Sequence, residues 1–250
     1  QLYDVSSSEI LKACTDATGW IIRSGTKIDA KIMKVSKKLR AVGRAGVGID
    51  NIDISAATRM GVVVMNTPDV NTISAAEHTI AMMLALSRNI SKGDFELKQK
   101  EWNRHLLIGT ELMDKTLGIV GLGKIGREVM TRALPFGMNV LGYDPFVDQE
   151  MFNSDEIKIV DLDELTERSD FITVHVPLNS QTENLFDKER LKNMKNSSRI
   201  INVSRGGIIN ENDLASALEN NEISGAAIDV FTEEPISKSN PLLNAPNTLL

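Results

Sequence analysis

The sequence predicts a doubly wound α/β fold, in which helices cover both faces of a parallel sheet. Short runs rich in Val, Ile and Leu alternate with segments of helical periodicity along most of the 250 residues. These runs are apolar at successive rather than alternate positions, which is typical of strands buried on both faces. Only 4% of the residues are aromatic, so we expect an aliphatic core between the sheet and the helices.

The first part of the chain is expected to form three strands and two helices. The pattern predicts strands over residues 19–23, 39–43 and 62–65 and helices over 30–38 and 55–60. A long helix follows, because Ile80, Met83 and Ile90 recur at helical spacing and Ser74 and Glu77 have the spacing of a capping box. We expect this helix to end between residues 89 and 93.

The second part continues the alternation of strands and helices. Strands are expected over residues 117–120, 140–143, 157–160, 171–176, 199–203 and 225–230, and helices over 124–136, 162–168, 187–193 and 211–220. Asn210 is a favourable cap for the last of these helices. A connector containing Pro and Asn, residues 67–74, predicts a domain boundary, with one domain over 1–70 and another over 71–250.

Composition disfavours several classes of partner and setting. A net charge of −6 argues against nucleic acid and anionic membranes. A single cysteine, Cys14, permits no intrachain disulfide and suits a reducing, cytoplasmic setting. The first ten residues lack the basic start and apolar centre of a signal peptide, and no apolar run reaches the about 18 residues of a membrane span. No His or Cys cluster has the spacing of metal ligands, so we expect no metal site.

A glycine-rich loop is the strongest local signal. Gly121, Gly123 and Gly126 form G-x-G-x-x-G between a predicted strand and a predicted helix. These glycines allow a tight turn, close approach of a pyrophosphate and packing of the helix on the strand. Asp144 follows 18 residues after Gly126, at the end of the next strand. Its carboxylate would bind the adenosine ribose and repel a 2′-phosphate, so we expect a Rossmann domain that binds NAD rather than NADP.

Several motifs together resemble the D-isomer-specific 2-hydroxyacid dehydrogenases. They are GRAGVGIDNID (43–53), MNTPDVNTISAAEHTIAMMLALSRNI (65–90), GTELMDKTLGIVGLGKIG (109–126), YDPF (143–146), DFITVHVPL (170–178), INVSRGGIIN (201–210) and AAIDVFTEEP (226–235). The resemblance implies that residues 71–250 are the NAD-binding domain. It also implies that residues 1–70 are part of a smaller, flavodoxin-like α/β substrate domain.

The resemblance implies catalytic roles for two residues. Arg205 matches the arginine that binds the substrate carboxylate and polarises the reacting carbonyl. Glu234, rather than its neighbour Glu233, matches the acid that orients the catalytic histidine. Other matched positions are implied to border the cofactor: Lys124 and Ile125 on the pyrophosphate, and Val176, Val203, Ser204 and Asp229 beside the nicotinamide.

The proton donor for this reaction is expected outside the chain. The family's catalytic histidine follows the EEP turn in a Pro-His pair, which would lie beyond Leu250. We therefore expect a fragment that lacks elements at both ends and is catalytically impaired by itself. His78 is expected to pack or to cap its helix, and His105 to be solvated in a polar loop. His175, at the end of a strand, is the internal alternative for the acid/base.

Three arginines suggest a phosphorylated substrate. The resemblance to members that oxidise 3-phospho-D-glycerate places Arg23, Arg44 and Arg104 near the substrate phosphate and the Val47 backbone near its carboxylate. Three cations would suit a phosphate dianion together with a carboxylate. Each arginine could instead be an ordinary surface residue. Val47 stands where many members have Thr, so a hydroxyl contact is lost there.

Two alternatives to the oxidation of phosphoglycerate in serine biosynthesis remain open. One is a glyoxylate or hydroxypyruvate reductase, which would not need the three arginines. The other, of a different class, is an NAD-sensing binding protein on the same scaffold, similar to the carboxy-terminal binding corepressors. The long helix and the loop with Arg104 resemble the family's dimer-forming elements, so we expect a homodimer or a tetramer.

Overall fold

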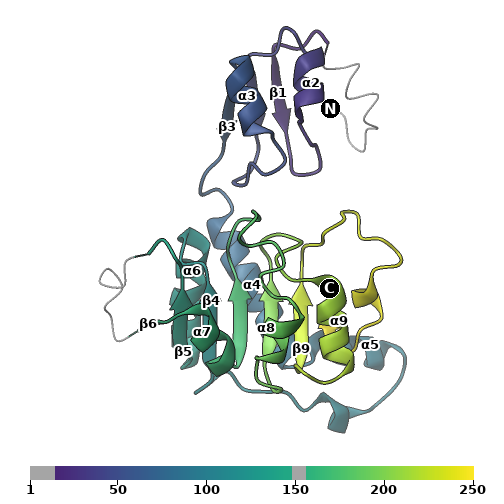
Figure 1. Ribbon diagram of the computed structural model, residues 1–250. Coiled ribbons are helices and arrows are strands. Elements are labelled where there is room, and N and C mark those ends of the chain that lie inside the picture. Colours follow the sequence, from purple (N-terminus) through teal and green to yellow (C-terminus); the bar gives the residue numbers. More distant parts are fainter. Residues whose placement is uncertain (1–14, 148–155) are drawn as a thin grey trace. The chain divides into compact units, whose positions relative to one another are not determined.

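The chain forms two compact units. The computed structural model describes residues 15–147 and 156–250. The first unit ends at Asn71 and the second begins at Thr72 (Figure 1). The described elements of both units are parallel strands connected by helices. This arrangement confirms the predicted α/β class with a parallel sheet.

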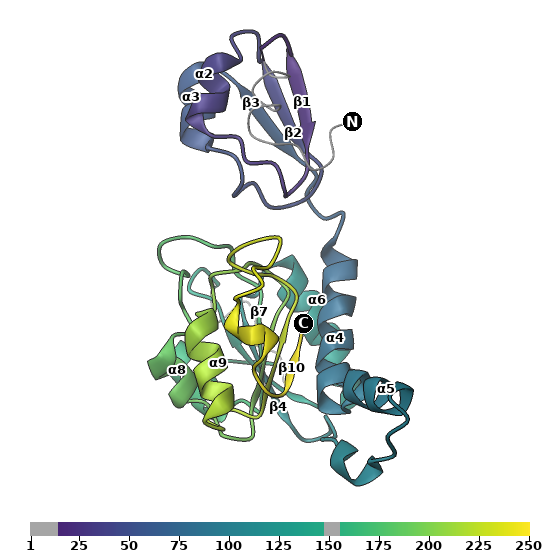
Figure 2. The ribbon, with the colours of Figure 1, turned by 90° about the vertical axis from the view of Figure 1, so that its right-hand side faces the viewer.

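The first unit is built on a three-stranded parallel sheet in the order β1-β2-β3. Its strands are β1 (Gly19–Ile22), β2 (Ala41–Arg44) and β3 (Val63–Asn66), and its helices are α2 (Ala30–Val35) and α3 (Ile54–Met60). The two helices lie on one face of the sheet (Figure 2). Each begins where an aspartate accepts backbone N–H bonds, Asp29 for α2 and Asp53 for α3. Ile22 of β1 is in register with Arg44 of β2, so these two strands end side by side.

The second unit contains a seven-stranded parallel sheet in the order β10-β9-β8-β7-β4-β5-β6. The strands are β4 (Thr116–Val120), β5 (Asn139–Tyr143), β6 (Lys158–Ile159), β7 (Phe171–Val174), β8 (Arg199–Asn202), β9 (Gly225–Ile228) and β10 (Thr248–Leu249). The chain builds outward from β4 through β5 to β6 and then restarts with β7 on the other side of β4. Such a reversal of strand order marks the carboxyl edge where ligands bind in this class of sheet.

Helices cover both faces of the larger sheet (Figure 2). One face carries α4 (Thr72–Ser87) and α6 (Lys124–Ala133), and the other carries α7 (Leu162–Arg168), α8 (Lys188–Lys192) and α9 (Glu211–Glu219). Successive residues of one strand enter opposite cores, as Ile200 and Ile201 of β8 do. Burial on both faces is therefore the reason why the strands are apolar at successive positions.

The long-helix region differs from the prediction. α4 begins at Thr72, so Ser74 lies within the first turn and is not the N-cap of a capping box. The helix ends at Ser87, and Asn89 adopts a left-handed conformation with φ 53°. A second helix, α5 (Ile90–Lys98), and a 3₁₀ turn, η1 (Arg104–Leu107), follow where a loop was expected. The left-handed residue changes the chain direction, which periodicity alone does not reveal.

Two further short elements were not predicted. They are η4 (Pro241–Leu243) and β10, which pairs through only two residues with β9. Several predicted strands also end earlier than expected: Val176, Val203 and Asp229 lie in loops beyond β7, β8 and β9. These loops gather at the carboxyl edge of the sheet.

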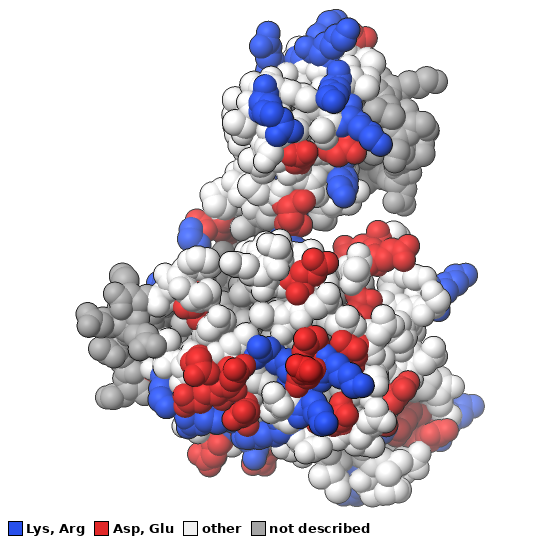
Figure 3. All heavy atoms as spheres, in the orientation of Figure 1, with Lys and Arg blue, Asp and Glu red and all other residues white. Residues whose placement is uncertain are grey.

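The surface of the second unit carries both acidic and basic side chains. On the face of the second unit seen in Figure 3, acidic and basic side chains are interspersed. On α7, Glu164 accepts hydrogen bonds from Lys158 and Arg168, and these bonds lower the pKa of its carboxyl. Among the described residues, no helix has the length and apolar character needed to cross a bilayer.

Candidate cofactor and substrate site

The glycine loop joins β4 to α6 at the carboxyl edge of the sheet. Gly121 has φ 98°, and a Cβ there would lie 2.6 Å from the backbone oxygen of His175. At Gly126, a Cβ would lie 2.1 Å from the oxygen of Gly121, so only glycine lets the helix pack on the loop. Gly123, the N-cap of α6, differs from both because a Cβ there would meet no atom within 4 Å. The loop is thus closed toward the protein and open above Gly123.

The loop and helix start have the chemistry of an anion site. Gly123 offers no side chain to the first N–H groups of α6. Those N–H groups carry the positive end of the helix dipole, which favours a phosphate at this place. Lys124 and Ile125 form the start of the helix, and Lys124 is exposed. These residues fit a pyrophosphate, since a Cβ at Gly123 would occupy the open space.

Asp144 lies beside this loop, directly after β5. Its Oδ2 accepts the Leu122 N–H at 2.9 Å and its Oδ1 accepts the Phe146 N–H at 3.0 Å. The carboxylate therefore fixes the loop between Gly121 and Gly123 as well as the end of β5. A carboxylate next to a phosphate loop suits the two hydroxyls of an adenosine ribose.

Asn202 shapes the loop that carries Arg205. Its buried side chain accepts the N–H and hydroxyl of Ser204 at 3.0 and 2.8 Å and donates to the oxygen of Arg205 at 2.8 Å. The half-buried guanidinium of Arg205 donates to the Ser204 oxygen at 2.6 Å. Gly206 then passes so close to Phe231 that a Cβ would lie 2.0 Å from the Phe231 backbone. Sequence reasoning missed Asn202, although a polar residue ending an apolar strand is a usable signal.

The loop after β9 brings Glu234 to the same edge. Glu234 is exposed, and its Oε1 accepts the Phe231 N–H at 3.2 Å. Glu211, at the start of α9, accepts bonds from Thr232 and Asn240 in this loop. Glu211 was not singled out from the sequence, because its partners lie 21 and 29 residues away.

His78 does not have the packing or capping role that was expected. The side chain is about half exposed, and its Nε2 lies 3.1 Å from Oδ1 of Asp229. Asp229 follows β9, and its N–H donates to the oxygen of Asn202 at 3.0 Å. α4 therefore runs antiparallel to the strands, with its first half at the carboxyl edge.

His175 is poorly suited to the role of acid/base. Its Nε2 lies 2.9 Å from the hydroxyl of Thr173, which is fully buried. Burial lowers the pKa of His175 to about 4. The imidazole is therefore neutral near pH 7 and does not carry the proton that a general acid must supply. His105 lies exposed in η1, in a short helical turn instead of the expected loop.

The residues expected to border the cofactor follow neighbouring strands. Lys124 and Ile125 come after β4, Val176 after β7, Val203 and Ser204 after β8, and Asp229 after β9. These strands are adjacent in the order β9-β8-β7-β4. The structure therefore brings this group together with Asp144 and Arg205 at one edge of the sheet.

In the first unit, Arg23 and Arg44 lie at the same edge of the small sheet. Arg23 follows β1 and is exposed, while Arg44 ends β2. The Arg44 guanidinium lies over Gly46, where a Cβ would be 1.3 Å from its Nη1. The Val47 oxygen accepts the amide of Asn66 at 2.7 Å, which holds the following loop against β3.

Arg104 lies apart from Arg205. The Ser87 oxygen, at the end of α4, accepts the Thr110 N–H at 2.8 Å, and Thr110 also binds Arg199 at the start of β8. The segment between them, α5 and η1, therefore extends from the amino edge of the sheet (Figure 1). One chain therefore does not bring Arg104 to the carboxyl edge of its own larger sheet, and the placement of Arg104 near the substrate phosphate stays a prediction.

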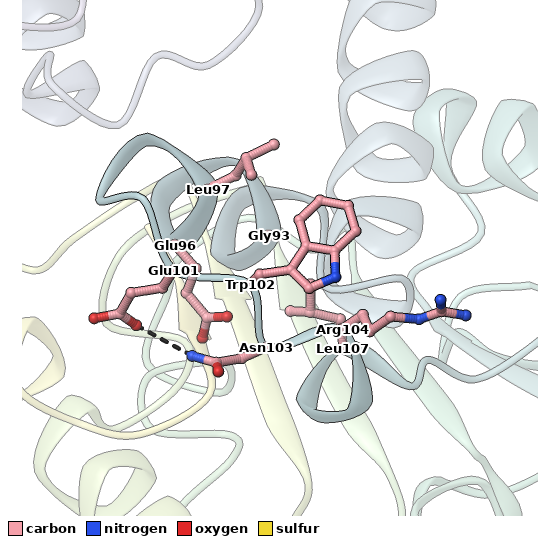
Figure 4. Close-up of a pocket in the computed structure, with 8 residues that line it drawn as sticks. All are labelled: Gly93, Glu96, Leu97, Glu101, Trp102, Asn103, Arg104 and Leu107. Atoms are coloured by element: carbon pink, nitrogen blue, oxygen red, sulfur yellow. Dashed lines mark hydrogen bonds between the residues drawn. The ribbon is translucent and has the colours of Figure 1, made fainter.

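The surroundings of Arg104 leave its side chain directed outward. A pocket of about 140 Å³ lies between α5 and η1, and Glu96, Glu101 and Trp102 contribute to its lining. Figure 4 shows the Arg104 guanidinium pointing away from both carboxylates. Within the described part of the chain it forms no ion pair.

The described residues contain no group of three or more His, Cys, Asp or Glu side chains that could hold a metal ion.

Comparisons with known proteins match this geometry. Residues 80–250 match the family model described as D-isomer specific 2-hydroxyacid dehydrogenase, NAD binding domain. A D-3-phosphoglycerate dehydrogenase of Methanocaldococcus jannaschii is 46% identical over 98% of this chain and 47% of its own length. A protein of the same name from Synechocystis is 48% identical over 94% of this chain and 42% of its own length. The chain spans about half the length of the curated relatives it matches.

A solved structure is similar over nearly the whole chain. An NAD-dependent formate dehydrogenase from Staphylococcus aureus, in complex with NAD, superposes with a TM-score of 0.89 at 33% identity. The match covers 97% of this chain and 73% of that one.

Proposed function

Because the chain belongs to the D-isomer-specific 2-hydroxyacid dehydrogenase family, we propose that its protein oxidises 3-phospho-D-glycerate to 3-phosphohydroxypyruvate with NAD. This reaction would be the first step of L-serine biosynthesis. The observation that carries the proposal is the identity of 46–48% to proteins named D-3-phosphoglycerate dehydrogenase. In this proposal the second unit binds NAD and the first unit contributes to substrate binding.

The second unit has the residues that NAD would need. Gly121, Gly123 and Gly126 would hold the pyrophosphate on the start of α6, and Asp144 would bind the adenosine ribose. Asp144 is also the reason to expect NAD rather than NADP, because its carboxylate would repel a 2′-phosphate. When bound, NAD accepts a hydride from the carbon that carries the substrate hydroxyl.

Arg205 would bind the substrate. Its guanidinium lies at the carboxyl edge, on a loop fixed by Asn202, and can form a bidentate pair with a carboxylate. The same group would stabilise negative charge on the reacting oxygen. Lysine cannot replace it, since a single ammonium lacks the planar pair of donors.

Glu234 would support the acid/base histidine expected beyond Leu250. A carboxylate beside an imidazole fixes its orientation and raises its pKa. The hydrogen bond from the Phe231 N–H holds Glu234 at the same edge as Arg205. The histidine would take the hydroxyl proton while the hydride leaves the adjacent carbon.

The arginines would recognise the phosphate, with Arg104 acting across a homodimer. Arg23 and Arg44 would belong to the same chain's site, while Arg104 would reach the site of a second copy. The segment with α5 and η1 supports this assembly, because Phe95, Trp102 and Ile108 are 64–82% exposed there. Large apolar side chains on one extended segment favour burial against another subunit.

NADH oxidation by the full-length protein tests the proposal. 3-Phosphohydroxypyruvate, hydroxypyruvate and glyoxylate are compared as substrates by kcat/KM. We expect a strong preference for the phosphorylated acid, and loss of that preference in Arg104→Ala. A preference for the unphosphorylated acids would make the protein a reductase of the glyoxylate type. NADH binding without turnover of any of the three would favour a binding protein.

A further inference from the structure

Glu211 connects the start of α9 to a loop distant in sequence. Its Oε1 accepts the N–H of Thr232 at 2.6 Å and the hydroxyl of Thr232 at 2.8 Å. Its Oε2 accepts the side-chain amide of Asn240 at 2.6 Å. All three donors are neutral, and hydrogen bonds to an ionised acceptor are stronger than those between neutral groups. One carboxylate thus holds both ends of the segment from Thr232 to Asn240.

The start of the helix does not require this carboxylate as its cap. Asn210 already fills that role, because its Oδ1 accepts the N–H groups of Asn212 and Asp213 at 3.1 Å. Glu211 is therefore directed toward the loop and not back onto the helix.

The loop that Glu211 holds is the one that carries Glu234. The Glu234 carboxylate accepts the N–H of Phe231, the residue before Thr232. On the other side, Gly206 packs against the same backbone, since a Cβ on it would lie 2.0 Å from Phe231 and 2.5 Å from the nitrogen of Thr232. Gly206 is the neighbour of Arg205. The peptide between Phe231 and Thr232 is therefore contacted from both sides, by the residue next to Arg205 and by the Glu234 side chain.

We propose that Glu211 is a positioning residue, which sets the place of Glu234 relative to Arg205 by holding Thr232 and Asn240. The inference rests on the proposed dehydrogenase function and extends it. A purely stabilising role would alter thermal stability without altering the acid/base. A positioning role would have a further consequence, because a displaced Glu234 would no longer raise the pKa of the histidine that it is proposed to orient.

Glu211→Gln is the decisive variant. A glutamine has one accepting oxygen and one donating amide, so it cannot accept from both Thr232 and Asn240. We expect kcat for reduction of the keto acid to fall roughly 10- to 100-fold, as misplacement of catalytic groups by about 1 Å does. The alkaline limb of the kcat/KM profile should move about 0.5–1 pH unit lower. The affinity for NADH, measured by fluorescence titration, should stay unchanged, since the glycine loop is untouched.

Two further variants make the test specific. Glu219→Gln removes the same charge from the other end of α9. Among the described residues no hydrogen bond joins Glu219 to the loop, so this variant should retain the wild-type profile. If Glu211→Gln does not fold, Thr232→Val replaces it, because it removes only the hydroxyl donor to Oε1. For Thr232→Val we expect the alkaline limb of the kcat/KM profile to move to lower pH by less than in Glu211→Gln.

The possible failures are distinguishable. An active wild type together with a Glu211→Gln profile that does not shift would overturn the positioning role alone. An unshifted profile accompanied by a lower Tm would also overturn it, because that is the mark of a stabilising residue. A wild type that turns over none of the three keto acids would instead overturn the dehydrogenase function, and the inference with it.

Discussion

Replacing Gly123 and Gly126 by alanine should separate cofactor binding from stability. A Cβ at Gly123 would meet no atom within 4 Å, so the protein without ligand should lose only the preference of an N-cap for glycine over alanine, about 1 kcal/mol or less. The new methyl group would nevertheless stand where the pyrophosphate has to approach. We expect the Kd for NADH to rise at least about tenfold, which corresponds to about 1.4 kcal/mol.

Gly126→Ala should lower the stability of the protein without ligand more than Gly123→Ala does. Its Cβ would lie 2.1 Å from the Gly121 oxygen and 3.2 Å from the side chain of Ile119. Overpacking of this kind lowers the free energy of unfolding by about 1–3 kcal/mol. The higher helix propensity of alanine offsets at most about 1 kcal/mol of this loss. At about 2–4 °C per kcal/mol, we expect Tm to fall by several degrees. Cofactor binding should weaken as well, because the clash displaces the loop itself.

Both variants are assayed by thermal unfolding without ligand and by titration with NADH. The expected pattern is weak binding with a Tm lowered by no more than about 4 °C for Gly123→Ala, and weak binding with a larger fall in Tm for Gly126→Ala. Wild-type affinity in Gly123→Ala would refute the placement of a pyrophosphate over this loop. A wild-type Tm in Gly126→Ala would refute the close packing of α6 on the loop.

Three more predictions concern single side chains. Asp144→Ala should weaken NADH binding and lower the preference for NADH over NADPH about tenfold, measured as the ratio of the two Kd values; an unchanged ratio would exclude a ribose contact. Arg205→Lys should lower kcat/KM about 100-fold or more with NADH affinity retained, and unchanged turnover would make Arg205 a surface residue. For His175, burial holds the pKa at about 4 against 6.5 when unfolded. As the pH falls, the unfolded state therefore takes up a proton at His175 at a higher pH than the folded state does. The free energy of unfolding should decrease between pH 6.5 and pH 4, by up to about 3 kcal/mol. Urea unfolding should show a smaller decrease for His175→Gln, and an equal decrease in both proteins would contradict the assignment.

Local chemistry explains why the cofactor loop could be recognised from the sequence. Gly121 and Gly126 each answer a steric demand, at the adjacent strand and within the loop itself, whereas Gly123 leaves open space above the loop. Asp144 directly follows β5, the next strand along the chain. The α/β class was equally accessible, because strands such as β8 must be apolar on both faces to contact helices on both sides.

Only the tertiary structure decided the features that depend on distant segments. The pairing of His78 with Asp229 spans 151 residues, and Glu211 reaches partners 21 and 29 residues away. The left-handed Asn89 directs α5 away from α4, so Arg104 lies at the amino edge although its motif suggested the substrate site. No local pattern encodes these contacts, because each depends on where the sheet places segments that are far apart in the chain.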